Sequence, residues 1–212
     1  MFANVLSKDQ LKVIKKIHSL PEGAYMAGGT ALTLQFGHRT SLDFDFYTEK
    51  HFETEKILAG FQSDFSQVKV EKVAKDTLIF EVDGVSLSLF YYPYRLIKPL
   101  VNFGNISLAS IEDIAAMKMI AISMRGKRRD FIDVYYLLKK FSLSQIIEFT
   151  LKKYPPYQPM VILKGLIYFK DAEGEDFLRK IEIFDKDFSW EKAKKMISKE
   201  VEKYQLSMIK KD

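Results

Sequence analysis

The sequence predicts an α+β fold, a small mixed sheet followed by a bundle of helices. Strand-like runs with alternating apolar residues lie between residues 24 and 92, whereas the second half of the chain shows helical apolar spacing. The 212 residues are 47% hydrophobic and 14% aromatic, which is ample material for a packed core. We therefore expect a sheet domain at residues 1–105 and a helical domain at residues 106–212, packed on each other.

The first half begins with a helix and continues with strands and short helices. Ser7 and Gln10 form an N-capping box, which predicts a helix that starts at residue 8 and ends before the Pro21–Gly23 break. A strand at 24–27 enters a tight Gly28-Gly29-Thr30 turn, and a helix at 31–36 closed by Gly37 follows. The remaining elements of this half are a strand at 42–48, a helix at 54–61, and strands at 68–73, 77–82 and 85–92, the last two joined by an Asp83-Gly84 hairpin turn.

The second half is predicted to be helical throughout. Ser110, Ser142 and Ser189 are placed as N-caps ahead of amphipathic runs. The expected helices cover residues 110–124, 129–140, 142–154, 158–169 and 189–208.

Composition limits the chemistry that the chain can perform. It has no cysteine and three histidines, which excludes disulfides, Cys-ligated zinc and a thiol nucleophile. Carboxylates, lysines and hydroxyls remain as the carriers of chemistry. The net charge is +5, from 33 basic and 28 acidic residues. No run approaches the ~18 apolar residues that a membrane helix needs, and no signal peptide pattern opens the chain, so we expect a cytoplasmic protein without a membrane partner.

A glycine turn and two aspartates form the first group of candidate site residues. Gly28 and Gly29 let the backbone approach a phosphate closely, and Thr30 can add a hydroxyl donor at the start of the following helix. Asp43 and Asp45 alternate with apolar residues, so both point to one face of a strand, where they can hold Mg²⁺. The plain alternative is a turn followed by two solvated aspartates.

The second group lies on the first two helices of the second half. Lys118 falls in the middle of an apolar helix face, where it needs an anion, either an internal carboxylate or a ligand phosphate. Arg125 lies on the same face. Asp130 and Asp133 share one face of the next helix, with Lys118, Arg125 and Arg129 as candidate partners. A purely structural salt-bridge network is the alternative.

Four motifs in this order resemble the AbiEii/AbiGii-type nucleotidyltransferase family, which belongs to the DNA polymerase β-like superfamily. The motifs are Met26-Ala-Gly-Gly-Thr-Ala-Leu, His38-Arg-Thr-Ser-Leu-Asp-Phe-Asp-Phe-Tyr, Ile111-Glu-Asp-Ile-Ala-Ala-Met-Lys and Arg129-Asp-Phe-Ile-Asp. The resemblance covers roughly residues 20–140. It implies a minimal nucleotidyltransferase sheet with a helical C-terminal domain and a nucleotide in the cleft between them.

The resemblance also implies roles for individual residues. Asp43 and Asp45 would bind Mg²⁺, or Mn²⁺ in its place, and Ser41 matches a serine that the family places beside these carboxylates. Asp130 or Asp133 would complete the catalytic cleft, with Arg129 as an additional member. The residues expected to contact a nucleoside triphosphate are Gly28, Gly29, Thr30, Ser41, Lys118 and Arg125.

The implied activity is transfer of a nucleoside monophosphate from a triphosphate to an acceptor hydroxyl. Family members act as toxins of toxin–antitoxin pairs, and some extend the 3′ end of tRNA, so tRNA, protein and an antitoxin are the expected partners. One departure concerns the third metal carboxylate of the superfamily, because Ser86 and Ser88 stand in the strand that should supply it. A catalytically weak nucleotide- or protein-binding module and a small-molecule nucleotidyltransferase are the alternatives.

Overall fold

The computed structural model describes residues 1–173 and 181–209, which form two compact units, Met1–Ser110 and Ile111–Asp212. The boundary falls after Ser110 instead of after residue 105. The reason is that residues 106–108 form a strand of the sheet. The α+β prediction is confirmed, with a mixed sheet in the first unit and helices in the second.

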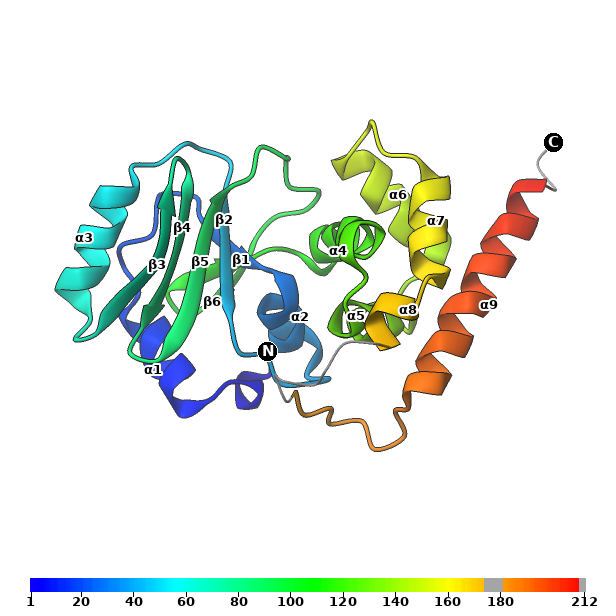
Figure 1. Cartoon of the computed structure of the whole chain (residues 1–212), viewed down its shortest axis with the longest axis horizontal. Helices are drawn as coiled ribbons and strands as arrows, with labels where there is room; N and C mark the ends of the chain where they lie inside the picture. Colours follow the sequence, from blue (N-terminus) through cyan, green and yellow to red (C-terminus); the bar gives the residue numbers. More distant parts are fainter. Residues whose placement is uncertain (174–180, 210–212) are drawn as a thin grey trace. The chain divides into compact units, whose positions relative to one another are not determined.

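The sheet of the first unit has seven strands in the order β3-β4-β5-β2-β1-β7-β6 (Figure 1). Two of its pairings are parallel, β2 with β5 and β1 with β7, and the others are antiparallel. The strands are β1 (Tyr25–Ala27), β2 (Phe44–Thr48), β3 (Val68–Ala74), β4 (Thr77–Val82), β5 (Val85–Tyr91), β6 (Val101–Phe103) and β7 (Ile106–Leu108). The predicted hairpin turn is confirmed, since Asp83 and Gly84 both have positive φ.

One face of this sheet forms the core. Phe44 of β2, Leu87 of β5 and Phe80 of β4 lie side by side in register and are buried. Phe61 of α3 (Thr54–Asp64) packs on Phe80 with ring centroids 4.8 Å apart. Asp45, which alternates with the phenylalanines, therefore points to the opposite face, as the period of two predicts.

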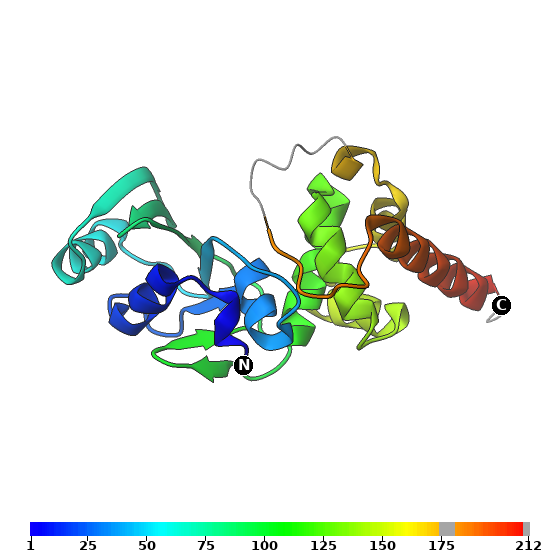
Figure 2. The ribbon, with the colours of Figure 1, turned by 90° about the horizontal axis from the view of Figure 1, so that it is seen from below.

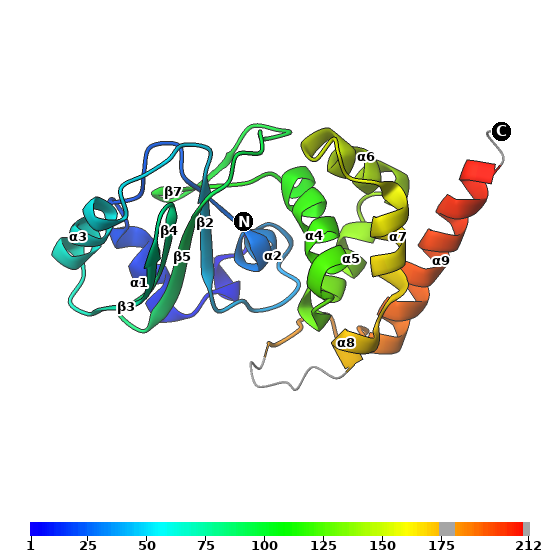
Figure 3. The same cartoon turned by 45° about the horizontal axis from the view of Figure 1, so that its top comes forward.

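The helices of the first unit differ from their predicted bounds at informative places. The capping box of α1 (Lys8–Lys16) is present, but the helix ends at Lys16, four residues before the predicted end. The predicted Gly28–Thr30 turn is instead the first turn of α2 (Gly28–Phe36), because Gly28, with φ +69°, joins β1 directly to the helix. A short 3-10 helix, η1 (Ala3–Val5), precedes α1. The α2 helix packs on β1 and β2 (Figure 3).

The second unit is organised around α4, which packs against α5, α6 and α7 (Figure 1). Gly165 permits the close crossing of α4 and α7, since a Cβ there would lie 2.9 Å from the Cα of Ser123. The α9 helix is long and straight and packs against α5, α6 and α7 (Figure 2). The helices are α4 (Ile111–Arg125), α5 (Arg128–Leu138), α6 (Leu143–Lys153), α7 (Pro159–Ile167), α8 (Lys170–Glu173) and α9 (Trp190–Ile209).

Asp185 attaches the segment before α9 to α5. Its carboxylate accepts hydrogen bonds from Lys139 Nζ at 3.0 Å and from Tyr136 Oη at 3.2 Å. The hydrogen bond from Lys139 lowers the pKa of Asp185. Among the described residues, no helix has both the length and the apolar character needed to cross a membrane.

Candidate active site

The glycine turn, Gly28 and Gly29, lies where β1 ends and α2 begins. A Cβ on Gly28 would lie 3.0 Å from Asp45 Oδ2, so the turn is in close contact with a candidate metal ligand. Ala27 at the N-cap has no side chain that could cap α2. The first N–H groups of this nine-residue helix therefore form the kind of site that binds a phosphate.

Asp43 immediately precedes β2 and Asp45 is the second residue of that strand, and both are half-buried. Ser88 of β5 stands directly opposite Asp45 in the parallel pairing, and its hydroxyl donates to Asp45 Oδ1 at 2.7 Å. The strand expected to supply a third carboxylate thus places a serine against Asp45. This serine fixes the orientation of the Asp45 carboxylate.

The hydroxyls of Thr30 and Ser41 form a hydrogen-bond network that reaches the backbone carbonyl of Asp43. The Thr30 hydroxyl lies within hydrogen-bond distance of the Asp43 carbonyl oxygen and 2.8 Å from Ser41 Oγ. A carbonyl oxygen can only accept a hydrogen bond, so the Thr30 hydroxyl donates to the Asp43 carbonyl. It then accepts a hydrogen bond from the Ser41 hydroxyl. Thr30 is 1% exposed. Its hydroxyl makes hydrogen bonds inside the protein, and these bonds connect the first turn of α2 to residues 41–43.

The donor set suits a magnesium ion that shares its ligands with a substrate. Mg²⁺ is usually bound through one or two carboxylates, with waters and substrate phosphates completing the octahedron. Asp43 and Asp45 offer two carboxylates, and the N terminus of α2 lies beside the carboxylate of Asp45. Across residues 1–173 and 181–209, no group of three or more histidine or acidic side chains is arranged as a metal site.

A second group of predicted residues forms a buried ion cluster in the second unit. Lys118 of α4 lies 2.7 Å from Asp130 Oδ1 and 2.6 Å from Asp133 Oδ2, both on α5. All three side chains are nearly inaccessible to solvent. Arg125 Nε approaches Asp130 Oδ2 at 3.6 Å, and about half of its side chain, 52%, is exposed. Of the two partners that the sequence left open for Lys118, the structure contains the internal carboxylates.

The remaining predicted residue, Arg129, is partly buried in the first turn of α5. The structure thus places the predicted residues in two groups. Gly28, Gly29, Thr30, Ser41, Asp43 and Asp45 lie together in the first unit, and Lys118, Arg125, Arg129, Asp130 and Asp133 lie in the second.

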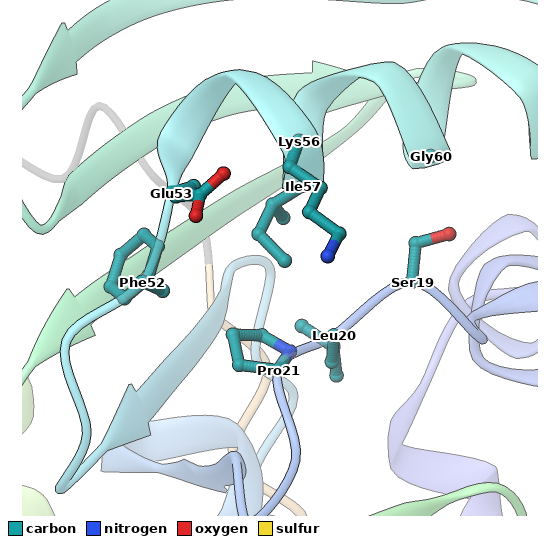
Figure 4. Close-up of a pocket in the computed structure, with 8 residues that line it drawn as sticks. All are labelled: Ser19, Leu20, Pro21, Phe52, Glu53, Lys56, Ile57 and Gly60. Carbon is teal, nitrogen blue, oxygen red and sulfur yellow. The ribbon is translucent and has the colours of Figure 1, made fainter.

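The described chain also contains clefts that are distinct from the aspartate site. One, of about 430 Å³, opens between residues 19–21 and α3, with Lys56 and the apolar Ile57 on the helix side (Figure 4). It contains none of the predicted site residues. Another, of about 390 Å³, lies between the end of α4 and α7 and includes Arg125 among its lining residues.

Sequence reasoning did not assign a role to two residues that contact the site. One is Ser88, which was noted only as a substitute for an expected carboxylate. The other is Arg39, a cation only 2% exposed, packed against the glycine turn. Its place inside the motif that runs from His38 to Tyr47, four residues before Asp43, is the signal that could have identified it.

Comparisons with known proteins identify the family of the chain. The family model described as "Nucleotidyl transferase AbiEii toxin, Type IV TA system" matches residues 16–203. The uncharacterised protein aq_aa25 of Aquifex aeolicus (strain VF5) is 37% identical over 207 residues, which cover 94% of this chain and 97% of that protein.

Solved structures with low sequence identity share the fold. MenT4, a nucleotidyltransferase toxin of Mycobacterium tuberculosis H37Rv, superposes with a TM-score of 0.62 at 13% identity, covering 91% of this chain and 80% of its own. JHP933 of Helicobacter pylori gives a TM-score of 0.59 at 16% identity, covering 99% and 95%. With the family model matching most of its length, this chain belongs to the AbiEii nucleotidyltransferase toxin family.

Proposed function

We propose that this nucleotidyltransferase transfers a nucleoside monophosphate from a nucleoside triphosphate to an acceptor hydroxyl with the help of Mg²⁺, and that it acts as the toxin of a toxin–antitoxin pair. The observation that carries the proposal is the contact between the glycine turn and Asp45, where a Cβ on Gly28 would approach Asp45 Oδ2 to 3.0 Å. Phosphate-binding backbone and a metal carboxylate are thereby adjacent in one unit.

Each residue of the first unit has a separate task in this proposal. The free N–H groups of the first turn of α2 receive phosphate oxygens, and the helix dipole favours their negative charge. Asp43 and Asp45 hold the magnesium ion, which neutralises charge on the triphosphate when it is bound. Ser88 keeps the Asp45 carboxylate in place. The acceptor oxygen attacks the α-phosphorus and pyrophosphate leaves, so catalysis rests on positioning and charge neutralisation.

The second unit contributes cations in this proposal. Arg125, whose side chain is 52% exposed, is our candidate in this unit for binding a phosphate of the ligand. Lys118 is different, because it already bridges Asp130 and Asp133 and must give up part of these ion pairs to bind a phosphate. Its first task is to orient the two carboxylates of α5. Asp130 and Asp133 remain our candidates for completing the catalytic residues.

We propose RNA, with the 3′ end of tRNA as its first candidate, as the acceptor. The support is a run of basic residues where α4 meets α5, namely Arg125, Lys127, Arg128 and Arg129. Cations in such a run neutralise backbone phosphates without reading sequence. The description of the family as part of a type IV toxin–antitoxin system supports an antitoxin as the functional partner.

The test is transfer of label from each of the four nucleoside triphosphates, with Mg²⁺ and total RNA or total protein. We expect labelled RNA with the wild type and a loss of at least about a hundredfold in Asp43→Asn and Asp45→Asn, because each removes charge from the metal site. Asp9→Asn, at an exposed ion pair of α1, is the matched control and should transfer normally.

Two results would contradict the proposal. Full transfer by a correctly folded Asp43→Asn variant would remove the aspartates from the mechanism, with circular dichroism as the check on folding. A wild-type protein that binds nucleotide but labels neither RNA nor protein would favour a non-catalytic module, which the serine in place of a third carboxylate also favours.

A further inference from the structure

Arg39 is a buried cation behind the glycine turn. Its side chain is 2% exposed, and it belongs to the segment between α2 and β2. A guanidinium stays protonated at every accessible pH, so Arg39 brings a fixed positive charge into the protein interior. Burying a charge is costly unless the charged group is paired and hydrogen-bonded.

The guanidinium lies directly against the backbone of Gly29. A Cβ on Gly29 would be only 2.6 Å from Arg39 Nη2 and 3.6 Å from Cζ. Such a distance to Nη2 is far shorter than any real Cβ contact, and a side chain this buried has little freedom to move away. Gly29 is therefore the residue that allows Arg39 to reach the first turn of α2.

Arg39 also holds the segment that leads to the metal ligands. Its Nη1 donates to the carbonyl oxygen of Thr40 at 2.8 Å. The adjacent Ser41 hydroxyl lies 3.3 Å from the same Gly29 Cβ position and bonds to Thr30. One guanidinium thus connects the turn with the backbone that continues to Asp43.

We propose that Arg39 is a positioning residue for triphosphate binding, a role that rests on the proposed function. It fixes the glycine turn against the Thr40–Asp43 segment and places a permanent positive charge behind the N–H groups at the start of α2. A cation behind a helix N terminus adds to the field that attracts an anion. Arg39 does not need to touch the nucleotide, because it acts through the backbone of Gly29.

The first test is Arg39→Lys, which keeps the charge but loses the planar fork. Loss of a charge-assisted hydrogen bond predicts a KM for the nucleoside triphosphate raised about tenfold, with kcat changed much less. Inorganic triphosphate, titrated calorimetrically, should bind about tenfold more weakly. Arg95→Lys, at an exposed arginine of the same unit, is the control and should match the wild type.

The second test is a double-mutant cycle with Gly29→Ala. Lysine has no Nη2, so replacing Arg39 removes the shortest contact of the new methyl group and leaves only the milder one with Ser41 Oγ at 3.3 Å. We expect Gly29→Ala alone to weaken inorganic triphosphate binding about tenfold, and to add less than about twofold to the effect of Arg39→Lys. If Arg39→Lys does not fold, Gly29→Ala still tests the contact with Arg39 intact.

The outcomes separate this proposal from the proposed function. Wild-type triphosphate affinity in Arg39→Lys or in Gly29→Ala overturns the positioning role, and so does strict additivity in the cycle. A wild-type protein that binds inorganic triphosphate but transfers no nucleotide contradicts the proposed function alone. A merely structural Arg39 would lower the melting temperature and leave the triphosphate affinity of the folded protein unchanged.

Discussion

Ser88 orients a carboxylate of the proposed metal site without supplying a carboxylate of its own. Its hydroxyl donates to Asp45 Oδ1 at 2.7 Å, and the other oxygen of Asp45 faces the glycine turn. One oxygen of the carboxylate is therefore hydrogen-bonded, and the other lies close to the backbone of Gly28. Rotation of Asp45 is restricted before any ligand arrives, which reduces the entropy cost of binding a metal ion.

We predict a different defect for each of two Ser88 variants. Ser88→Ala removes the hydrogen bond to the Asp45 carboxylate and should lower transfer about tenfold. Ser88→Asp places a second carboxylate against Asp45, and like charges repel, so the melting temperature should fall in metal-free buffer and recover on addition of Mg²⁺. Thermal melts in EDTA and in Mg²⁺ check this. A Ser88→Asp melting temperature that ignores Mg²⁺ would contradict it.

At the residue scale, the sequence predicted directions better than contacts. The alternation around Asp45 correctly predicted that the aspartate and the phenylalanines point to opposite faces, because a strand has a fixed period of two. The hydroxyl of Thr30 was predicted for phosphate, whereas in the structure it reaches Asp43 and Ser41. Such a contact joins residues more than ten positions apart, and no local pattern encodes it.

At the scale of elements, α4 and α6 are joined by a buried ion pair. Lys153 Nζ lies 2.8 Å from Asp113 Oδ1, and neither side chain is exposed. Burying two charges costs several kcal/mol in desolvation, which their attraction in the low-dielectric interior roughly offsets. The pair therefore specifies how the two helices pack more than it stabilises the unit.

We predict that this pair is costly to break and cheap to replace. Lys153→Met leaves the buried Asp113 carboxylate without the Lys153 ammonium and should lower the free energy of unfolding by about 3–5 kcal/mol. The double variant Asp113→Leu/Lys153→Met should recover most of that loss, because apolar side chains carry no desolvation penalty. Urea denaturation measures both. A double variant as unstable as the single one would show that Asp113 stabilises the unit through contacts other than its ion pair with Lys153.

Helices with strong local signals were predicted well, and two of the three-residue strands were not. The capping boxes at Ser7 and Ser142 are both present and start α1 and α6 as expected. The β6 and β7 strands were missed because three residues are too few to show alternation. The start of α2 was also missed, since two glycines disfavour a helix by propensity and are used here for close contacts.

For the whole molecule, the order of strands is the feature that sequence patterns could not provide. The β2 strand lies between β5 and β1, and β1 pairs in parallel with β7, joining Met26 to Leu108. These pairings are non-local, so no window of sequence contains both partners. The missed β7 also explains the boundary, which was predicted at residue 105 and lies after Ser110.

Ligand binding gives a final prediction that is measured on the complete chain. A ligand that binds only the folded state at about 100 times its Kd stabilises it by about 2.7 kcal/mol. For a chain of this length, that corresponds to a rise in melting temperature of about 5–10 °C. We expect nucleoside triphosphate with Mg²⁺ to produce such a shift in differential scanning calorimetry.

The shift should also show where the binding residues are. The glycine turn, Asp43 and Asp45 all lie in Met1–Ser110, so if the two units melt in separate transitions, the transition of the first unit should move most. EDTA should abolish most of the shift, and Asp45→Asn should do the same in the presence of Mg²⁺, because the carboxylates and the triphosphate share the metal ion. An equal shift in EDTA, or in Asp45→Asn, would place nucleotide binding away from the aspartates and would contradict the assignment of the site.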